Sequence, residues 1–248
     1  MNSNEQQAIR LAKTFRQDHD LGISPIKDVF EMVHTTIGID AFSIDAAEEE
    51  HGLTMLDPQT GRRVIVVATT PHPMRQRSSV AHELGHLLRG DLEITEPTCP
   101  GERSPAEICA DAFARHLLLP LDAVRTRLAE TEKASPADLS DLVQEYEVSP
   151  AIAALQLRDT HLITEETCRD WRRFPSKHLA VQFGWLNQYN SIAEGSRRPR
   201  APQTLMKRAV AAYQDGVLGI TELAAWYGTS EHNLRTELGE PRPASRTP

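Results

Sequence analysis

The sequence contains little cysteine and no long hydrophobic run, and each shortage excludes a class of protein. Its 248 residues include only three cysteines, at positions 99, 109 and 168. Three is too few, and an odd number, for a disulfide framework, so a reducing compartment is expected. No stretch of about 20 apolar residues is present, and residues 1–10 lack the apolar segment of a signal peptide. These absences predict a cytoplasmic protein without a membrane-spanning segment.

An excess of positive charge is also missing. The chain carries 27 basic and 35 acidic side chains, which gives a formal net charge of −8. This balance provides no general attraction to nucleic acid or to an anionic membrane, so neither is an expected partner. Hydrophobic residues make up 40% of the chain, which is enough to form a buried core at this length. One large domain or two small ones are therefore expected.

The segment 80–88 contains the pattern His-Glu-x-x-His, at His82, Glu83 and His86. On a helix, residues four apart lie on one face, one turn apart, so the two imidazoles can bind one metal ion. Zinc is the metal expected with this pattern. Glu83 lies about 100° round the helix from His82, where its carboxylate can act as a general base towards water. Gly85 lowers helix stability by up to about 1 kcal/mol against alanine, which predicts a close approach by another part of the chain.

A catalytic zinc site needs a third protein ligand, and the short pattern alone also occurs by chance. Glu107 is the predicted third ligand, on a helix expected to begin at Ser104. Asp111, one turn later, is expected to accept the other ring N–H of a ligating histidine. The alternative is a capping box in which Glu107 only serves the helix start, with Ser104 as its partner. The third ligand would then come from the preceding loop, at Asp91, Glu96, Cys99 or Glu102.

A small sheet is predicted before the metal-binding helix, within a mostly helical α+β fold. Runs rich in β-forming residues mark the expected strands, at residues 39–44, 52–56 and 62–68. A loop with Pro58 and Gly61 separates the last two runs, as in a hairpin, so the sheet is expected to be antiparallel. An exposed sheet edge near the metal-binding helix would hold an extended peptide as an added strand.

Capping residues predict where the helices begin and end. Ser24, followed by Pro25, is expected to open a helix that ends at Gly38. The metal-binding helix is expected over residues 74–89, with Gly90 as its C-cap.

The C-terminal half contains two candidate helix-turn-helix pairs, in residues 138–163 and 220–238. The second pair is a candidate either for DNA binding or for packing and protein contacts. Its last segment holds Glu231 and Glu237 but a single Arg235, whereas phosphate contacts need positive charge, so protein contacts are preferred. Five aromatic residues predict a second small core in the tail from residue 166: Trp171, Phe174, Phe183, Trp185 and Trp226.

Two stretches, 81–88 (AHELGHLL) and 107–120 (EICADAFARHLLLP), resemble the ImmA/IrrE metallopeptidases. The family pattern is a His-Glu-x-x-His helix, then Glu-x-x-Ala-Asn/Asp-x-Phe-Ala and Leu-Leu-x-Pro. The resemblance implies a zinc-dependent, thermolysin-like fold with Glu107 as third ligand and Asp111 behind a histidine. It further implies that the substrate is a helix-turn-helix transcriptional repressor, whose cleavage releases genes under stress or mobile-element control.

This resemblance and the patterns above predict three parts. Residues 1–124 are expected to form the zinc metallopeptidase core, and residues 125–165 a helix-turn-helix-like region. Residues 166–248 are expected to form a C-terminal helical region that binds a partner.

The predicted function is that of a zinc endopeptidase, with zinc on His82, His86 and Glu107 and with Glu83 as general base. The oxyanion needs a further donor, and the sequence does not choose among four candidates: His116, His178, Tyr213 and Tyr227. The alternative function is a metal-stabilised regulatory module that binds a protein partner or DNA without proteolysis. A structural metal site, closed by a fourth ligand such as Cys99, would favour this alternative.

Overall fold

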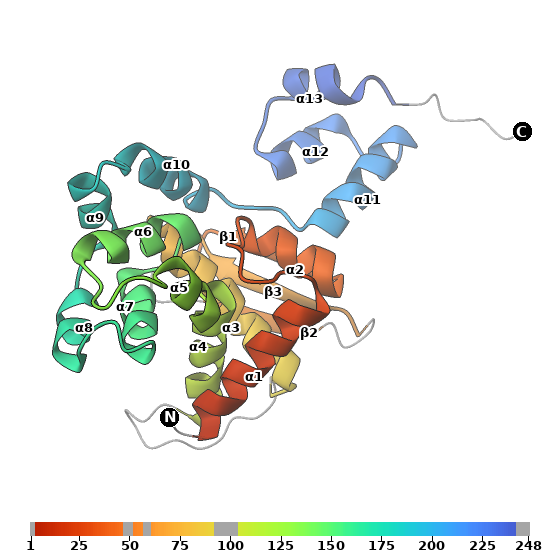
Figure 1. Ribbon diagram of the computed structural model, residues 1–248. Helices are drawn as coiled ribbons and strands as arrows, with labels where there is room; N and C mark the ends of the chain where they lie inside the picture. The colour runs from red at the N-terminus through yellow and green to blue at the C-terminus, as the bar shows by residue number, and fades with distance from the viewer. Residues whose placement is uncertain (1–2, 47–51, 57–60, 92–103, 242–248) are drawn as a thin grey trace, which may run out of the picture.

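Helices make up most of the computed structural model, which describes residues 3–46, 52–56, 61–91 and 104–241 (Figure 1). One sheet contains three strands, β1 (Asp40–Ile44), β2 (Gly52–Leu56) and β3 (Arg63–Ala68). The helices are α1 (Ser3–Asp18), α2 (Val29–Ile37), α3 (Pro73–Arg89), α4 (Pro105–Leu118), α5 (Leu121–Arg127), α6 (Pro136–Tyr146), α7 (Pro150–Asp159), α8 (Glu165–Trp171), α9 (Ser176–Gln182), α10 (Leu186–Ser196), α11 (Gln203–Gln214), α12 (Ile220–Tyr227) and α13 (Glu231–Leu238). The predicted α+β class is confirmed. No helix in these ranges is both long enough and apolar enough to cross a membrane.

Capping residues set the ends of the helices that carry the predicted metal ligands. α3 has Pro73 in its first turn and ends before Gly90, whose φ of 70° is the left-handed conformation that glycine adopts readily. Ser104 caps α4 by accepting a hydrogen bond from the backbone N–H of Glu107, at 3.1 Å. Gly38, with a φ of 69°, ends α2 in the same way as Gly90 ends α3. These predicted ends are confirmed.

The predicted start of α2 at Ser24 was wrong. α2 begins after Asp28, because the Asp28 carboxylate accepts hydrogen bonds from the backbone N–H groups of Phe30 and Glu31, each at 3.0 Å. The backbone around Ser24 has another role, since its carbonyl accepts a hydrogen bond from the guanidinium of Arg16. The segment before α2 therefore wraps around a buried arginine instead of continuing the helix.

The sheet is mixed, so the prediction of an antiparallel sheet was wrong for β1. The strand order is β1-β3-β2, in which β3 runs antiparallel to β2, as the predicted hairpin requires, but parallel to β1. Phe42 of β1 and Leu53 of β2 both pair with Val66 of β3. β3 takes the central place because it is the most buried strand, with Ile65, Val66 and Val67 enclosed. β2 is therefore an edge strand.

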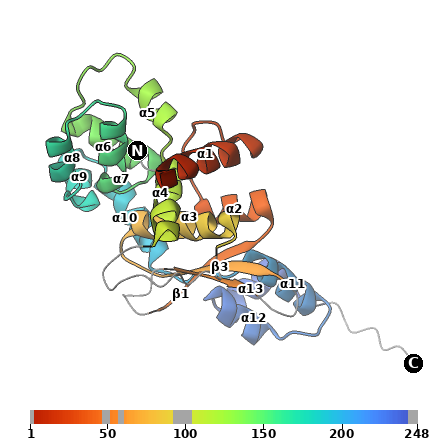
Figure 2. The same cartoon turned by 90° about the horizontal axis from the view of Figure 1, so that it is seen from below.

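α3 lies against the sheet and contacts both β3 and β2. Its side chains Val80 and Leu84 share the hydrophobic core with Ile65 and Val67 of β3. Burial of each such side chain stabilises the fold by about 1.5–3 kcal/mol relative to exposure. α4 packs against α3 on the side away from the sheet, and α1 packs against α4 (Figure 2). This packing fixes the metal-binding helix between an edge strand and α4.

The described residues form two hydrophobic cores. The first is shared by α1 to α10, and α11 to α13 enclose the second, whose buried residues are Met206, Ala209, Tyr213, Ile220, Leu223, Ala224 and Leu234. The predicted aromatic core of the tail was wrong, because Trp171 and Trp185 belong to the first core and Phe174 and Phe183 pack against it. Trp226 is 49% exposed. The three-part division of the chain stays a prediction.

Both predicted helix pairs are present, as α6 with α7 and as α12 with α13. Ser149 caps α7 by accepting a hydrogen bond from the backbone N–H of Ile152. Gly228, with a φ of 62°, ends α12, and Ser230 caps α13. Capped helix pairs of this kind are equally suited to packing and to recognition, so the pairs alone assign no function.

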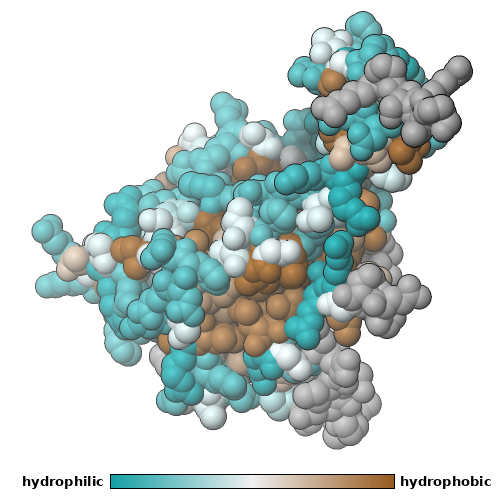
Figure 3. Space-filling view, turned by 90° about the vertical axis from the view of Figure 1, so that its right-hand side faces the viewer, coloured by the Kyte–Doolittle hydropathy of each residue, from teal (hydrophilic) through white to brown (hydrophobic). Residues whose placement is uncertain are grey.

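The C-terminal helices are attached to β1. The backbone N–H groups of Ser43 and Arg200 each donate a hydrogen bond to the other residue's carbonyl, both at 3.0 Å. The Asp40 carboxylate accepts hydrogen bonds from the backbone N–H and the hydroxyl of Thr204. α11 to α13 lie on the side of the sheet opposite α3 (Figure 2), and they project from the body of the molecule above an area where hydrophobic residues gather (Figure 3). They therefore do not cover the face of the sheet on which α3 packs.

A buried polar network joins α4 to α1 and α7. The Arg115 guanidinium donates to Gln156 at 3.2 Å, to Asp159 at 2.6 Å and to Glu5. Gln156 donates its amide N–H to Nδ1 of His116, at 3.2 Å. Burial, and then the positive charge of Arg115, lower the pKa of His116 to about 3. His116 is therefore neutral in the folded protein near neutral pH.

We expect His116 to make the protein less stable in mild acid. In the unfolded chain a histidine gains its proton below about pH 6.5, whereas His116 in the folded protein stays neutral down to about pH 3. Stability from this group is thus complete above pH 6.5 and falls as the pH is lowered towards 3, with about 2 kcal/mol lost between pH 7 and pH 5. Urea unfolding at both pH values should show that loss in the wild type but not in His116→Asn, which keeps an acceptor for Gln156. Equal losses in the two proteins would contradict the prediction.

Candidate metal centre

α3 presents His82 and His86 one turn apart, as predicted from their spacing. The two Nε2 atoms are 3.0 Å apart, and the side chains are 18% and 12% exposed. Both rings therefore point to one place that solvent still reaches, which is the arrangement that two histidine ligands of a single ion need.

α4 brings the Glu107 carboxylate to the same place. One carboxylate oxygen lies 3.3 Å from Nε2 of His82, and the other lies 3.1 Å from Nε2 of His86. The backbone N–H of Glu107 is capped by Ser104, but its carboxylate faces the histidines. Among the described residues, this is the one group of three or more metal-binding side chains, with ligand atoms within 4.8 Å of one another. Three loop alternatives lie outside the described residues: Glu96, Cys99 and Glu102.

A carboxylate holds the far side of each imidazole ring. Asp111 of α4 lies 2.8 Å from Nδ1 of His82, in the position predicted for it. Asp91, directly after the C-cap of α3, lies 2.9 Å from Nδ1 of His86 and is only 6% exposed. Asp91 was an alternative third ligand in the sequence, but it lies behind a histidine. Asp111 and Asp91 therefore occupy equivalent positions, each at the Nδ1 atom of one of the two histidines.

These hydrogen bonds decide which ring nitrogen carries the proton. An ionised carboxylate can only accept, so the Nδ1 atoms of His82 and His86 must be the donors. The lone pairs of the two Nε2 atoms then face each other across 3.0 Å, beside the Glu107 carboxylate. Two facing lone pairs and an anion repel one another unless a proton or a cation lies between them. Two nitrogens and one carboxylate are a donor set that fits zinc.

The charges around His82 favour a cation in the same way. Burial opposes a charged imidazole there, but the hydrogen bond to Asp111 and the negative charges of Asp111, Glu107 and Glu83 outweigh burial and raise the pKa of His82. The surroundings that stabilise an imidazolium also stabilise a bound metal ion. The electrostatics and the geometry of the donor atoms therefore both favour a bound cation at this place.

Replacing either aspartate with asparagine should weaken zinc binding without removing a ligand. Asp91→Asn and Asp111→Asn each remove the negative charge that orients a histidine ring, and such changes typically cost about 10- to 100-fold in metal affinity. Titration with a zinc-binding dye would measure the zinc affinity, with Asp122→Asn, an exposed site on α5, as the control. Wild-type affinity in both variants would show that the aspartates do not support the ligands.

Gly85 allows α4 to approach α3 closely, as its position in the sequence predicted. A Cβ atom at Gly85 would lie 3.0 Å from the Phe113 ring and 3.3 Å from the Cα of Ala110. Both neighbours belong to the same helix as Glu107. A larger residue at position 85 would thus separate the helix that carries two predicted ligands from the helix that carries the third.

Glu83 lies beside the histidines, against the edge strand. The Thr54 hydroxyl of β2 donates a hydrogen bond to Glu83 Oε2 at 2.9 Å. β2 passes so close that a Cβ atom at Gly52 would lie 3.1 Å from Glu83 Oε1. The carboxylate is therefore held in place by a strand, which suits a group that moves a proton.

The four oxyanion candidates lie elsewhere. His116 is buried against Gln156, and Tyr213 donates its hydroxyl hydrogen bond to the carbonyl of Gly239 in the second core. Tyr227 lines a cavity between α2 and the C-terminal helices, and His178 on α9 packs near the ring of Phe174. None of these four contacts the cluster of His82, His86 and Glu107, so the oxyanion donor stays unassigned.

The sequence did not indicate the contact between Thr54 and Glu83, and it offered Asp91 only as one alternative for the third ligand. Thr54 precedes Glu83 by 29 positions, and nothing in a short strand distinguishes one threonine from another. The position of Asp91 directly after Gly90 was a usable signal, because a left-handed C-cap reverses the chain and returns the next residue towards the last helical turn. Two other histidines precede the cluster in the sequence and were weak candidates as ligands: His72 lies at the start of α3, away from the cluster, and His51 lies outside the described ranges.

The family comparison agrees with this geometry. Residues 35–158, half of the chain, match the model of the family Peptidase_M78, described as the IrrE N-terminal-like domain. The matched region includes the two histidines, Glu83, both aspartates and Glu107. No curated protein matches the chain. The chain therefore belongs to the ImmA/IrrE (Peptidase_M78) family of peptidases.

Proposed function

We propose that this protein is a zinc-dependent endopeptidase. The observation that carries the proposal is the convergence of His82, His86 and Glu107 with Glu83 beside them. A structural metal site needs no general base, whereas a hydrolytic site does. The cluster, its neighbouring carboxylate and the peptidase family support the same function.

His82, His86 and Glu107 would hold the zinc, with Asp111 and Asp91 keeping the two rings oriented. Bound zinc acts as a Lewis acid that polarises the scissile carbonyl and lowers the pKa of water, to about 7 in well-studied enzymes. With three protein ligands, a fourth position stays available for water or substrate. The three ligands found among the described residues therefore fit a catalytic site.

Glu83 is the general base and then the general acid. Its carboxylate takes a proton from the attacking water and passes that proton to the nitrogen of the leaving amine. Thr54 stabilises the ionised carboxylate by donating a hydrogen bond to Oε2. The peptide bond breaks as the carbonyl carbon gains the oxygen of the water, so the products are a carboxylate and an amine.

The edge strand β2 suits an extended polypeptide substrate. Within the described residues, β2 pairs on one side only, with β3, and its residues Gly52 and Thr54 lie against Glu83. Leu53 and Met55 are 55% and 49% exposed. A substrate segment added along the free edge of β2 would therefore pass next to the general base.

We further propose that the substrate is a helix-turn-helix transcriptional repressor and that the reaction takes place in the cytoplasm, where cleavage would switch genes on. The resemblance to the ImmA/IrrE family supports this substrate. The charge of α13 disfavours DNA as the partner, because its Arg235 is paired with Glu240, at 3.1 Å. The protein would therefore bind the repressor directly, and not by binding the same DNA as the repressor.

Incubation of the zinc-loaded protein with repressors encoded beside its gene would test the proposal. Mass spectrometry should find two fragments whose masses correspond to cleavage of the repressor at one defined peptide bond. A chelator should prevent their formation. Full-length repressor after long incubation with the zinc-loaded protein would contradict it. Stable, salt-dependent binding of duplex DNA or of the repressor without cleavage would instead favour the regulatory-module alternative.

A further inference from the structure

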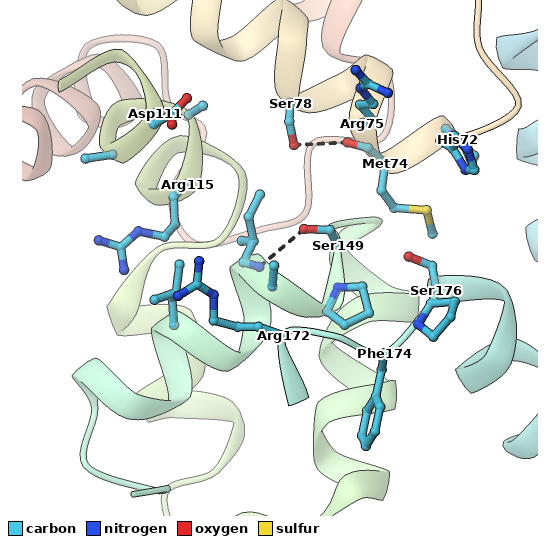
Figure 4. Close-up of a pocket in the computed structure, with 18 of the residues that line it drawn as sticks. His72, Met74, Arg75, Ser78, Asp111, Arg115, Ser149, Arg172, Phe174 and Ser176 are labelled. Atoms are coloured by element: carbon cyan, nitrogen blue, oxygen red, sulfur yellow. Dashed lines mark hydrogen bonds between the residues drawn. The ribbon is translucent and has the colours of Figure 1, made fainter. Parts of the chain in front are cut away.

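A large cavity lies next to the candidate metal centre. Its volume is about 1010 Å³, and it is enclosed by the start of α3, by α4 and α7, and by the segment from Arg172 to Lys177 (Figure 4). Asp111, which holds the ring of His82, forms part of its wall. The volume is at the upper end of the range for small-molecule pockets, so the cavity has room for several residues of a peptide.

The charged side chains of this cavity are mostly basic. Five of the lining residues are arginine or lysine and two are acidic: Arg75, Arg115, Arg158, Arg172 and Lys177, against Glu5 and Asp111. The whole chain has a net charge of −8, so this local excess of positive charge runs against the general composition. A concave site with one sign of charge concentrates ligands of the opposite sign.

Two of these cations have no ion-pair partner among the described residues. Arg115 is bound to Asp159 and Glu5, and Arg158 is bound to Asp159 and Glu165. Arg172 and Lys177 are exposed and appear in no such pair. Figure 4 shows the Arg172 side chain extending from the end of α8 across the cavity, towards the side where Arg115 and Asp111 lie. Its guanidinium is positioned to meet a ligand.

Much of the remaining wall is apolar, beside the polar residues His72, Ser78, Ser149 and Ser176. α4 and α7 contribute aliphatic residues and a proline to it: Ile108, Ala112, Pro150, Ile152 and Leu155. An apolar wall beside exposed cations fits a polypeptide segment that has both hydrophobic and acidic side chains. A nucleic acid could stack its bases on Phe174 and Tyr189, but it would leave the aliphatic residues of α4 and α7 without a partner, because its backbone presents charge and its bases prefer aromatic surfaces.

We propose that this cavity binds an acidic segment of the polypeptide substrate, with Arg172 and Lys177 as the residues that select it. The inference rests on the proposed endopeptidase function and specifies its substrate class: polypeptides with Asp or Glu side chains near the scissile bond. Guanidinium groups bind carboxylates through two parallel hydrogen bonds, which gives Arg172 selectivity as well as charge.

A peptide library derived from a digested proteome would measure the preference. The wild type should favour peptides with Asp or Glu near the cleaved bond. The double variant Arg172→Glu/Lys177→Glu should cleave acidic peptides about tenfold more slowly than the wild type, relative to its rate on neutral peptides. Arg173→Glu is the matched control, because Arg173 is also exposed and adjacent in sequence but does not line the cavity. It should behave as the wild type.

Binding to a Glu83→Gln protein separates this inference from the proposed activity, since it needs no turnover. A fluorescent Glu-rich peptide should bind more tightly than a Gln-rich peptide of the same length, and Arg172→Glu/Lys177→Glu should abolish the difference. Equal binding of the two peptides would overturn the inference even if the wild type cleaves peptides.

Failure of the wild type to cleave any peptide would overturn the proposed function instead. Displacement of the Glu-rich peptide by a duplex oligonucleotide of equal charge, at lower concentration, would make nucleic acid the ligand and overturn the inference.

Discussion

Glu83→Gln is expected to reduce the rate of peptide hydrolysis by about a thousandfold while the zinc content stays that of the wild type. General acid–base catalysis by one positioned group typically contributes about 10²- to 10⁴-fold. An amide has the size of the carboxylate and can still accept the hydrogen bond from Thr54, at present 2.9 Å long, but it takes no proton from water. The variant should therefore keep the structure of the site and lose its chemistry.

Two measurements on the same preparation check this expectation. The initial rate of cleavage gives the loss of activity, and mass spectrometry of the metal gives the zinc content. Glu130→Gln, a like change at an exposed turn residue away from the site, should leave both unchanged. A Glu83→Gln protein with wild-type activity would show that the proton moves through another group, and a loss of both zinc and activity would give Glu83 a structural role.

The residues whose positions the sequence predicted are those that depend on the geometry of one helix. His82 and His86 are one turn apart on any regular helix, and Glu83 follows from the same geometry. Gly85 could be interpreted in advance because glycine inside a helix costs stability and needs a reason. Glu107 was harder, since its spacing from Ser104 fits both a cap and a ligand. Only the approach of α4 to α3 shows that its carboxylate faces the histidines.

The parts that could not be predicted depend on contacts between distant segments. β3 lies between β1 and β2, where its residues Ile65 to Val67 are buried. The residue pattern of a single strand does not predict the order of the strands in a sheet. Trp171 and Trp185 lie close together in the sequence, as residues of a local core would, but they belong to the first core, where the Trp185 indole N–H donates a hydrogen bond to Ser140 of α6. The arginines and the lysine around the large cavity come from several segments of the chain. No local run of positive charge in the sequence therefore predicted this basic cavity.

Glu107→Ala is expected to lower zinc affinity by more than a hundredfold, because it removes one of three ligands. Loss of a group that only orients a ligand already costs about 10- to 100-fold. The Glu107 carboxylate lies 3.3 Å and 3.1 Å from the two Nε2 atoms, and among the described residues it completes the group of side chains that could hold a metal ion. Purified wild type should contain about one zinc per chain, and Glu107→Ala should contain almost none after dialysis against a weak chelator.

Ser104→Ala separates the two roles that the sequence allowed for Glu107. It removes the hydroxyl that caps α4, so it should cost about 1 kcal/mol of stability, but it leaves the Glu107 carboxylate in place and should keep the zinc. A capping role alone would give the opposite result, with Glu107→Ala and Ser104→Ala both destabilised and both loaded with zinc. In that case the third ligand would have to be sought in the segment between α3 and α4. Loss of zinc in Glu107→Ala with retention in Ser104→Ala would assign the carboxylate to the metal, because Ser104→Ala removes the cap and keeps the carboxylate, whereas Glu107→Ala removes the carboxylate and keeps the capped backbone N–H.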